Sequence, residues 1–336
     1  MNHEQTLSIV VPFYNEEENV APLIARVHEA LAEFPYPWEL ILVDDGSTDQ
    51  TRARIETAQQ QYGPHVRLVA LQRNFRQTAA MQAGIDVARG EIIVTMDGDL
   101  QNDPADIPRL VARLIDEELD VVSGWRKERK DDFWLRTLPS RIANALIGRI
   151  TGVRLHDYGC SLKAYRARTL KNITLYGEMH RFIPAWVAAV THPSRIAEEV
   201  VRHHPRQFGQ SKYGLSRTLR VILDLLFVYF FLRFRTRPGH FFGSIGIGFT
   251  ALGSLILTYL FALKLFFAEA IGGRPLLLVG FFLVLSGVQF LTTGVLAEML
   301  TRVYHETAQR PQYQVRTITP ANEVAEWKMP ATREVS

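Results

Sequence analysis

Short strand-like apolar runs alternate with longer mixed segments along the first two thirds of the chain. The clearest runs are residues 7–11, 39–43 and 92–96, and polar or acidic residues follow each of them directly. Helix-like sequence comes next in each case, which is the βαβ rhythm of a mostly parallel sheet flanked by helices. The predicted fold class is therefore α/β, with the polar residues gathered at the carboxyl edge of the sheet.

The last third of the chain has long apolar stretches instead. Residues 241–268 and 275–301 are nearly free of charge, and each exceeds the roughly 20 apolar residues that span a bilayer. Only a short turn ending at Gly272, Gly273 and Arg274 joins them. The sequence therefore predicts a transmembrane hairpin.

Arginines flank both ends of this hairpin. Arg233, Arg235 and Arg237 precede it, and Arg302 and Arg310 follow it. By the positive-inside rule both ends of the hairpin lie in the cytoplasm of a bacterial-type cell. We therefore expect a multi-pass protein of the inner (plasma) membrane whose α/β domain is cytoplasmic.

The segment before the hairpin mixes arginines with apolar residues, as in helices that lie along a membrane surface. A third spanning helix is the alternative, but Arg220, Asp224 and Arg233 bracket an apolar core that is too short to cross. The predicted parts are a cytoplasmic α/β domain at residues 1–214, interfacial amphipathic helices at 215–237, the hairpin at 238–304 and a cytoplasmic tail at 305–336.

Composition adds two limits. The formal net charge of +3 suits a surface held against anionic lipid, and no nucleic-acid-binding motif is visible, so nucleic acid is not an expected partner. Cys160 is the single cysteine, which excludes an internal disulfide and agrees with a reducing cytoplasm.

Two carboxylates one residue apart, Asp97 and Asp99, follow the strand-like run at 92–96. Hard cations such as Mg²⁺ or Mn²⁺ bind a few protein oxygens and complete their shell with substrate phosphates. Gln101 offers one further oxygen. An Asp-x-Asp pair also occurs in ordinary solvated turns, but here a second acidic pair, Asp44 and Asp45, ends another strand at the same predicted edge. The sequence predicts a divalent-metal site for a phosphorylated substrate.

Four stretches, residues 11–16, 43–49, 74–77 and 97–101, occur in the order typical of a known family. In them the chain resembles the inverting glycosyltransferases of family 2, which have a nucleotide-sugar-binding GT-A fold. Residues 103–104, 157–160 and 208–213 are similar to those of the polyprenyl-phosphate glycosyltransferases within that family, with 157–160 nearest to the aminoarabinose transferases. The resemblance extends from about residue 7 to about residue 304, and the last thirty or so residues match nothing.

The resemblance implies a reaction. We expect metal-dependent, inverting transfer of one sugar from a UDP- or GDP-sugar to a polyprenyl phosphate, such as undecaprenyl phosphate, at the cytoplasmic membrane face. The product would be a lipid-linked sugar donor for modifying envelope glycans. A lipid phosphate is already ionised near neutral pH, so it can attack without a strong general base. The sugar, the nucleotide base and the lipid length stay open.

The same resemblance implies roles for individual residues. Asp99 and Gln101 are expected to contact the metal, and Asp97 the metal or the sugar nucleotide beside it. Arg126 is expected to bind the acceptor phosphate and Asp157 a sugar hydroxyl, so that Asp99, Arg126 and Asp157 form the predicted catalytic set. The remaining expected substrate-binding residues are Pro12, Tyr14, Asn15, Glu16, Asp44, Asp45, Arg206, Ser211 and Lys212.

Two other functions fit parts of the pattern. A processive polysaccharide synthase of the same superfamily would usually carry a Gln-x-x-Arg-Trp motif and a larger membrane domain, and neither is visible. A non-catalytic membrane scaffold would have no physical need for clustered carboxylates at one edge. A hairpin this small also favours self-association, so a homo-oligomer is expected.

The chain departs from the family pattern at two positions. Gly98 stands where Ala is more common between the two carboxylates, and we expect that difference to be harmless. Phe13 stands where Val or Ala is frequent, which should affect shape rather than chemistry.

Overall fold

The computed structural model describes residues 5–127, 147–149, 152–175, 179–188, 190–205, 230, 238–307 and 315–319. The chain divides into two compact units, which are described separately: Met1–Leu225 with Pro311–Ser336, and Leu226–Arg310. Three predicted site residues, Arg206, Ser211 and Lys212, lie outside the described residues, as do the predicted interfacial helices apart from Phe230.

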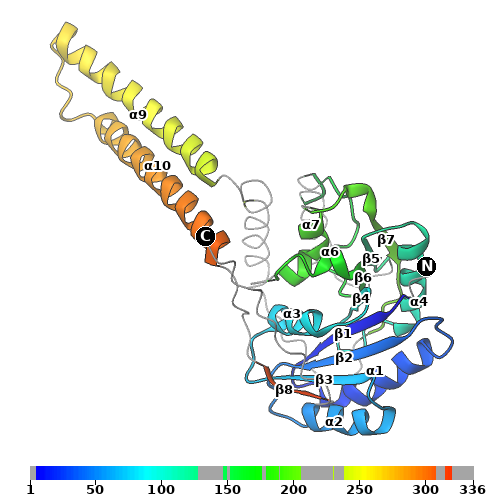
Figure 1. Cartoon of the computed structure of the whole chain (residues 1–336). Helices are drawn as coiled ribbons and strands as arrows, with labels where there is room; N and C mark the ends of the chain where they lie inside the picture. Colours follow the sequence, from blue (N-terminus) through cyan, green and yellow to red (C-terminus); the bar gives the residue numbers. More distant parts are fainter. Residues whose placement is uncertain are drawn as a thin grey trace, which may run out of the picture. The chain divides into compact units, whose positions relative to one another are not determined.

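The first unit is built on one twisted sheet (Figure 1). Its strand order over the described residues is β7-β5-β6-β4-β1-β2-β3-β8. Neighbours β1–β2, β1–β4, β2–β3 and β5–β7 run parallel, whereas β6 and β8 run antiparallel to their neighbours. The strands are β1 (Leu7–Phe13), β2 (Trp38–Asp44), β3 (Val66–Leu71), β4 (Ile92–Thr95), β5 (Val121–Trp125), β6 (Lys163–Arg166), β7 (Ile196–Val200) and β8 (Val315–Thr319). The mostly parallel α/β fold expected from the sequence is confirmed.

Helices cover both faces of this sheet (Figure 1). Alternate strand residues such as Val11, Leu42 and Val94 form one fully buried core with apolar residues of α1, α2 and α4. On the opposite face α3 packs closely, because a Cβ at Gly84 would lie 2.3 Å from Val10 Cγ1. The helices are α1 (Glu17–Ala30), α2 (Thr51–Tyr62), α3 (Gln77–Val87), η1 (Pro104–Asp106), α4 (Ile107–Asp116), α6 (Ala167–Leu170), η3 (Met179–Phe182), α7 (Ile183–Val187) and η4 (Pro193–Arg195).

Strand β8 comes from the segment after the apolar helices. It pairs antiparallel with the edge of β3, where Thr319 lies opposite Leu68 and Val315 opposite Leu71. The sequence predicts a tail from residue 305 onward, and no local pattern in it indicates this strand. The chain thus leaves the first unit before the apolar helices and rejoins the same sheet after them.

The second unit contains two helices, α9 (Pro238–Phe267) and α10 (Pro275–Thr307). By length and composition both can cross a membrane. Glycines let them approach closely, since a Cβ at Gly246 would lie 2.8 Å from the Gly287 carbonyl oxygen and one at Gly253 would lie 2.7 Å from that of Gly280. Outward apolar side chains such as Phe266 are mostly exposed, as lipid-facing residues are. The two helices correspond to the two predicted spans.

Candidate functional site

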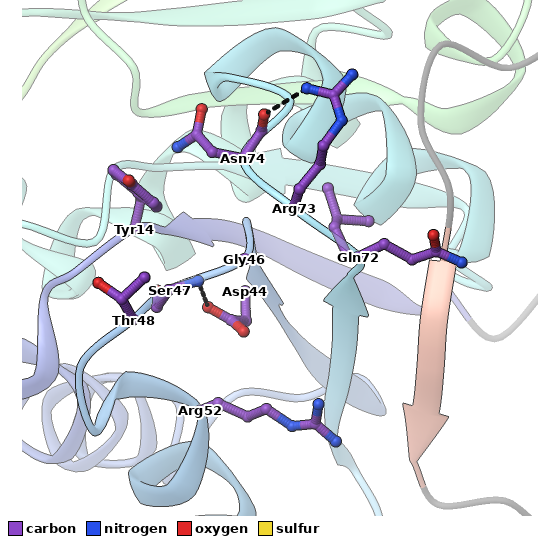
Figure 2. A pocket seen from close by; sticks show the side chains of 10 residues that line it. Tyr14, Asp44, Gly46, Ser47, Thr48, Arg52, Gln72, Arg73 and Asn74 are labelled. Atoms are coloured by element: carbon purple, nitrogen blue, oxygen red, sulfur yellow. Dashed lines mark hydrogen bonds between the residues drawn. The ribbon is translucent and has the colours of Figure 1, made fainter.

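The loops that follow β1, β2 and β3 enclose a pocket of about 460 Å³ (Figure 2). It opens at the carboxyl ends of parallel strands, where open α/β sheets bind ligands. Most of the residues that line it have polar side chains, which contribute carboxylate, hydroxyl, amide and guanidinium groups. The lining residues are Tyr14, Asp44, Gly46, Ser47, Thr48, Arg52, Leu71, Gln72, Arg73 and Asn74.

Hydrogen bonds between side chains and backbone hold these loops together. Asn15 has a positive φ of 52°, its N–H donates to Ser47 Oγ at 3.0 Å, and its Oδ1 accepts from the Thr48 N–H at 2.8 Å. The Ser47 N–H in turn donates to Asp44 Oδ1 at 3.0 Å (Figure 2). The side chains of Asn15 and Asp44 therefore hold the loops after β1 and β2 in place, and the pocket is formed without a ligand.

Gly46 lets the loop after β2 touch the loop after β3. Its φ is +66°, and a Cβ there would lie 2.4 Å from the Arg73 carbonyl carbon, so only glycine fits. Beside it, Asp45 Oδ1 accepts from the Phe75 N–H at 2.7 Å. Burial raises the pKa of Asp45 to about 6.

The residues expected to bind a nucleoside divide into three groups. Tyr14 and Asp44 line the pocket, and Asn15 and Asp45 brace its loops. Pro12 is paired with Val43 inside the sheet, and the Glu16 carboxylate accepts from Asn19 Nδ2 at 2.5 Å, so neither lines the pocket.

Two basic pocket residues were missed by the sequence reasoning. Arg52 lies in the first turn of α2, and Arg73 lies in the loop after β3. The Arg73 guanidinium stacks over the Phe75 ring, 4.3 Å from its centroid. The signal for Arg73 was present, because it immediately precedes the family-like stretch at residues 74–77.

Asp97 and Asp99 lie just past the end of β4 at the same edge. Asp97 Oδ1 accepts from Gln77 Nε2 at 2.6 Å, and Gln77 is the first residue of α3. Burial, together with the charge of Asp99, raises the pKa of Asp97 to about 6. Asp99 is 8% exposed, and its Oδ1 accepts from the Gln101 N–H at 3.1 Å. Gln77 is a further residue of this site that the sequence reasoning did not single out.

This arrangement fits a hard divalent cation. Two carboxylates close enough to repel each other, with a glutamine nearby, form an oxygen-only set of the kind that Mg²⁺ and Mn²⁺ accept. Among the described residues no three His, Cys, Asp or Glu side chains converge on one point. A cation held here would therefore keep positions open for substrate oxygens.

Gly98, between the two carboxylates, packs against Phe13. A Cβ at residue 98 would lie 2.7 Å from Phe13 Cε1 and 2.8 Å from Phe13 Cδ1. Phe13 is only 2% exposed, so its ring cannot swing into solvent. In this chain the ring of Phe13 occupies the space that an alanine methyl group at residue 98 would need, so the two departures from the family pattern fit each other.

Arg126 and Asp157 form an ion pair at the other half of the same edge. Arg126 follows β5, its Nε donates to Asp157 Oδ2 at 2.7 Å, and its second nitrogen, Nη2, donates to Oδ1 at 3.1 Å. The side chains are 17% and 6% exposed. Glu198 Oε1 accepts from the Asp157 N–H at 3.0 Å and so fixes the segment that carries the pair. The structure brings together two of the three predicted catalytic residues, with Asp157 in a bidentate contact that the sequence had not indicated.

Comparisons with known proteins agree with this geometry. Residues 8–174 match the family model described as glycosyl transferase family 2. Over 312 residues the chain is 60% identical to the dodecaprenyl-phosphate galacturonate synthase of Rhizobium johnstonii, a match that covers 93% of this chain and 92% of that protein. The chain belongs to glycosyl transferase family 2. It is an enzyme of the glycosyltransferase class, so the non-catalytic scaffold is set aside.

A second group of relatives is more distant. The undecaprenyl-phosphate 4-deoxy-4-formamido-L-arabinose transferase of Pseudomonas aeruginosa is 37% identical over 316 residues, covering 94% of this chain and 91% of that protein. Both matches cover more than 90% of this chain and of the relative. The resemblance to polyprenyl-phosphate glycosyltransferases inferred from the motifs is thus confirmed.

Solved structures support the GT-A fold. Glucosyl-3-phosphoglycerate synthase from Mycobacterium tuberculosis, in complex with phosphoglyceric acid, matches 67% of this chain and 80% of its own with a TM-score of 0.52 and 22% identity. The same synthase in complex with Mn²⁺, UDP-glucose and phosphoglyceric acid matches with a TM-score of 0.51 and 21% identity, over 67% and 80% of the two chains. At this level of identity the likeness establishes the fold alone.

Proposed function

We propose that this glycosyltransferase moves one sugar from a nucleotide diphosphate donor to a polyprenyl phosphate, and that the sugar is a hexuronate such as galacturonate. The observation that carries the proposal is the joint placement, at one sheet edge, of a polar nucleotide-sized pocket, an Asp97–Asp99 pair and a buried Arg126–Asp157 pair. The choice of a uronate is supported by the 60% identity to the dodecaprenyl-phosphate galacturonate synthase of Rhizobium johnstonii.

The pocket suits the nucleoside of a UDP- or GDP-sugar. Arg52 and Arg73 supply positive charge, while Asp44 and Thr48 supply oxygens for ribose hydroxyls or base edges. The diphosphate would then extend toward Asp97 and Asp99. A Mg²⁺ or Mn²⁺ ion bound by Asp97, Asp99 and Gln101 would neutralise the departing diphosphate. The glucosyl-3-phosphoglycerate synthase of Mycobacterium tuberculosis, which has a similar fold, has been solved with Mn²⁺ and UDP bound, and this supports the choice of cofactor.

The acceptor side is supported by Arg126. A planar guanidinium binds phosphate oxygens well, and Arg126 retains nitrogen donors beyond the two that contact Asp157. The lipid phosphate would attack the anomeric carbon from the face opposite the diphosphate, with inversion, and needs no deprotonation near pH 7. The chain's own contribution is then to hold two anionic reactants in line.

The path of the chain supports a membrane hairpin with both ends on one side. Strand β8 belongs to the same sheet as β1 to β7, although α9 and α10 lie between β7 and β8 in sequence. A single folded sheet occupies one side of a membrane, so the chain between residues 205 and 315 must cross an even number of times. Two spanning helices satisfy this count, whereas a third span in residues 215–237 would violate it.

Sugar transfer into an organic-extractable lipid tests the proposal. Purified full-length protein would be incubated with undecaprenyl phosphate, Mn²⁺ and radiolabelled UDP-galacturonate, with UDP-glucose and GDP-mannose in parallel. We expect label in the lipid phase from the uronate donor, lost on addition of EDTA. Asp99→Asn, which keeps the shape of the side chain, should lower the rate at least 100-fold, while the matched control Asp116→Asn, at an exposed position ending α4, should not change it.

The outcomes separate the parts of the proposal. Transfer of a neutral sugar but not of galacturonate would overturn the uronate assignment and keep the polyprenyl-phosphate reaction. Nucleotide binding without transfer from any donor to any polyprenyl phosphate would overturn the acceptor assignment. Near wild-type activity of Asp99→Asn would remove the metal-binding role from that residue.

A further inference from the structure

Lys163 is a buried lysine in the middle of the sheet, between the two halves of the site. It opens β6, where it lies opposite Thr95 of β4 and Ser123 of β5. Thr95 is two residues before Asp97, and Ser123 is three residues before Arg126. Sheet register therefore places Lys163 in the row directly below the strand ends that carry these two groups.

The environment of Lys163 is unusual for a lysine. Its side chain is 1% exposed, whereas lysines almost never bury fully without a charged partner. Its Nζ donates to the Cys160 carbonyl oxygen, and within the described part of the chain no carboxylate comes within ion-pair distance of it. An ammonium has three donor hydrogens. One neutral acceptor does not account for the burial of a full positive charge.

The charged groups around Lys163 are those of the site itself. Asp97 and Asp157 attract its ammonium, Arg126 repels it, and the buried thiol of Cys160 lies alongside. Burial lowers the pKa of Lys163, and burial likewise raises the pKa of Cys160 to about 11, which keeps the thiol neutral. With Lys163 charged, Arg126 and Lys163 offset the charges of Asp97 and Asp157, and the carboxylate of Asp99 beside Asp97 is a further negative charge.

We propose that Lys163 is a positioning residue of the transfer reaction, a buried counter-cation that balances Asp97 and Asp157 so that a second anionic reactant can enter beside them. Arg126 is already engaged by Asp157 in a bidentate contact and cannot alone offset both carboxylates and an arriving phosphate. Lys163 does not touch the reactants and acts through these two carboxylates. This inference rests on the proposed function only where its test measures sugar transfer.

Lys163→Gln is the test variant, because a glutamine amide can still donate to the Cys160 carbonyl while the charge is gone. We expect the KM for polyprenyl phosphate to rise and kcat/KM for it to fall about 10- to 100-fold, as for loss of one charged interaction, with a much smaller change in the KM of the nucleotide sugar. Lys163→Arg should recover most of the activity. Lys171→Met is the control. The Lys171 Nζ also donates to a backbone carbonyl, that of Ala88 at 2.5 Å, but this contact lies near the start of β4, at the end opposite Asp97.

A binding measurement separates charge from mere support of the fold. Removing a buried positive charge near Asp97 should tighten Mn²⁺ binding to the nucleotide-free protein by roughly tenfold, whereas a disturbed carboxylate site would weaken it. Manganese titration followed by electron paramagnetic resonance gives this value for wild type, Lys163→Gln, Lys163→Arg and Lys171→Met. Thermal unfolding should give a lower Tm for Lys163→Gln than for wild type and Lys163→Arg, because loss of the counter-cation leaves Asp97 and Asp157 uncompensated in the buried site.

Tighter Mn²⁺ binding together with poorer use of the lipid acceptor supports the proposal. Unchanged kinetics, or weaker Mn²⁺ binding in Lys163→Gln, overturns it. If Lys163→Gln fails to fold, Lys163→Met serves in its place, with Lys163→Arg as the charged reference. If the wild-type protein transfers no sugar, the proposed function is wrong. The comparisons of Mn²⁺ affinity and Tm among the variants would still decide whether Lys163 acts by its charge.

Discussion

Gly98 and Phe13 form a coupled pair, and their coupling can be measured. An alanine methyl group at residue 98 would come within 2.7, 2.8 and 3.0 Å of three ring carbons of Phe13, all well inside van der Waals contact. Gly98 does not have a positive φ, so the backbone itself accepts alanine. Steric overlap with one buried ring is therefore the whole of the expected effect.

Overpacking of this kind typically costs about 1–3 kcal/mol. In a domain of roughly 200 residues each kcal/mol lowers Tm by about 2–4 °C. Gly98→Ala should therefore unfold several degrees below wild type. In a Phe13→Val background, where the ring is gone, the same substitution should cost close to nothing, because the methyl group then fills part of the space the ring leaves.

The assay is a double-mutant cycle on purified full-length protein, with unfolding of the first unit followed by tryptophan fluorescence in the absence of nucleotide and metal. The coupling free energy between the two positions should be about 1–3 kcal/mol and favourable. An equal loss of stability from Gly98→Ala in both backgrounds would refute the reasoning, since the clash with Phe13 could not then be the cause. Phe13→Val alone serves as the matched control for loss of the ring.

Two further predictions concern pH and topology. Burial holds the pKa of Asp45 above its usual value, at about 6, and Asp44 and Arg73 are the charged groups that face it. The folded state therefore favours the protonated carboxyl group. As a result, the free energy of unfolding of wild type falls as pH rises from about 4 to above 6. Asp45→Asn should therefore gain Tm relative to wild type at pH 7.5 and gain little at pH 4.5, and a difference independent of pH would contradict the burial argument. For topology, single cysteines introduced as Gly272→Cys and Ser336→Cys should react with a membrane-impermeant maleimide from opposite sides of spheroplast membranes, with Cys160 silent because it is buried. Labelling of both from one side would contradict the two-span hairpin, because α10, which lies between the two positions, would then not cross the membrane.

Much of the architecture followed from the sequence because it depends on local patterns. Runs of apolar and β-branched residues set the strands, and the acidic pairs after them had to meet at one edge because parallel strands end together. Length and absence of charge were sufficient to locate α9 and α10. The ordered motifs identified the family, since Asp97 and Asp99 are recognisable by type and spacing alone.

Contacts between residues far apart in sequence could not be read in this way. Nothing local in Val315–Thr319 indicates that it joins the edge of β3, about 250 residues earlier in the chain. The two departures from the family pattern, Gly98 and Phe13, looked independent and become one feature only when the ring is seen beside the missing methyl group.

For the site too, residue types follow from the sequence, whereas contacts between the residues follow from the tertiary structure. The sequence by itself determined which residue types stand at the strand ends, and hence that this is a family 2 glycosyltransferase with an oxygen-rich edge. Tertiary structure alone decided that Asp157 is paired with Arg126, that Gln77 holds Asp97, and that Lys163 is buried between them. The physical reason is that whether a segment forms a strand depends on residues one or two positions away in the sequence. Burial and charge pairing depend instead on which strands lie side by side in the sheet.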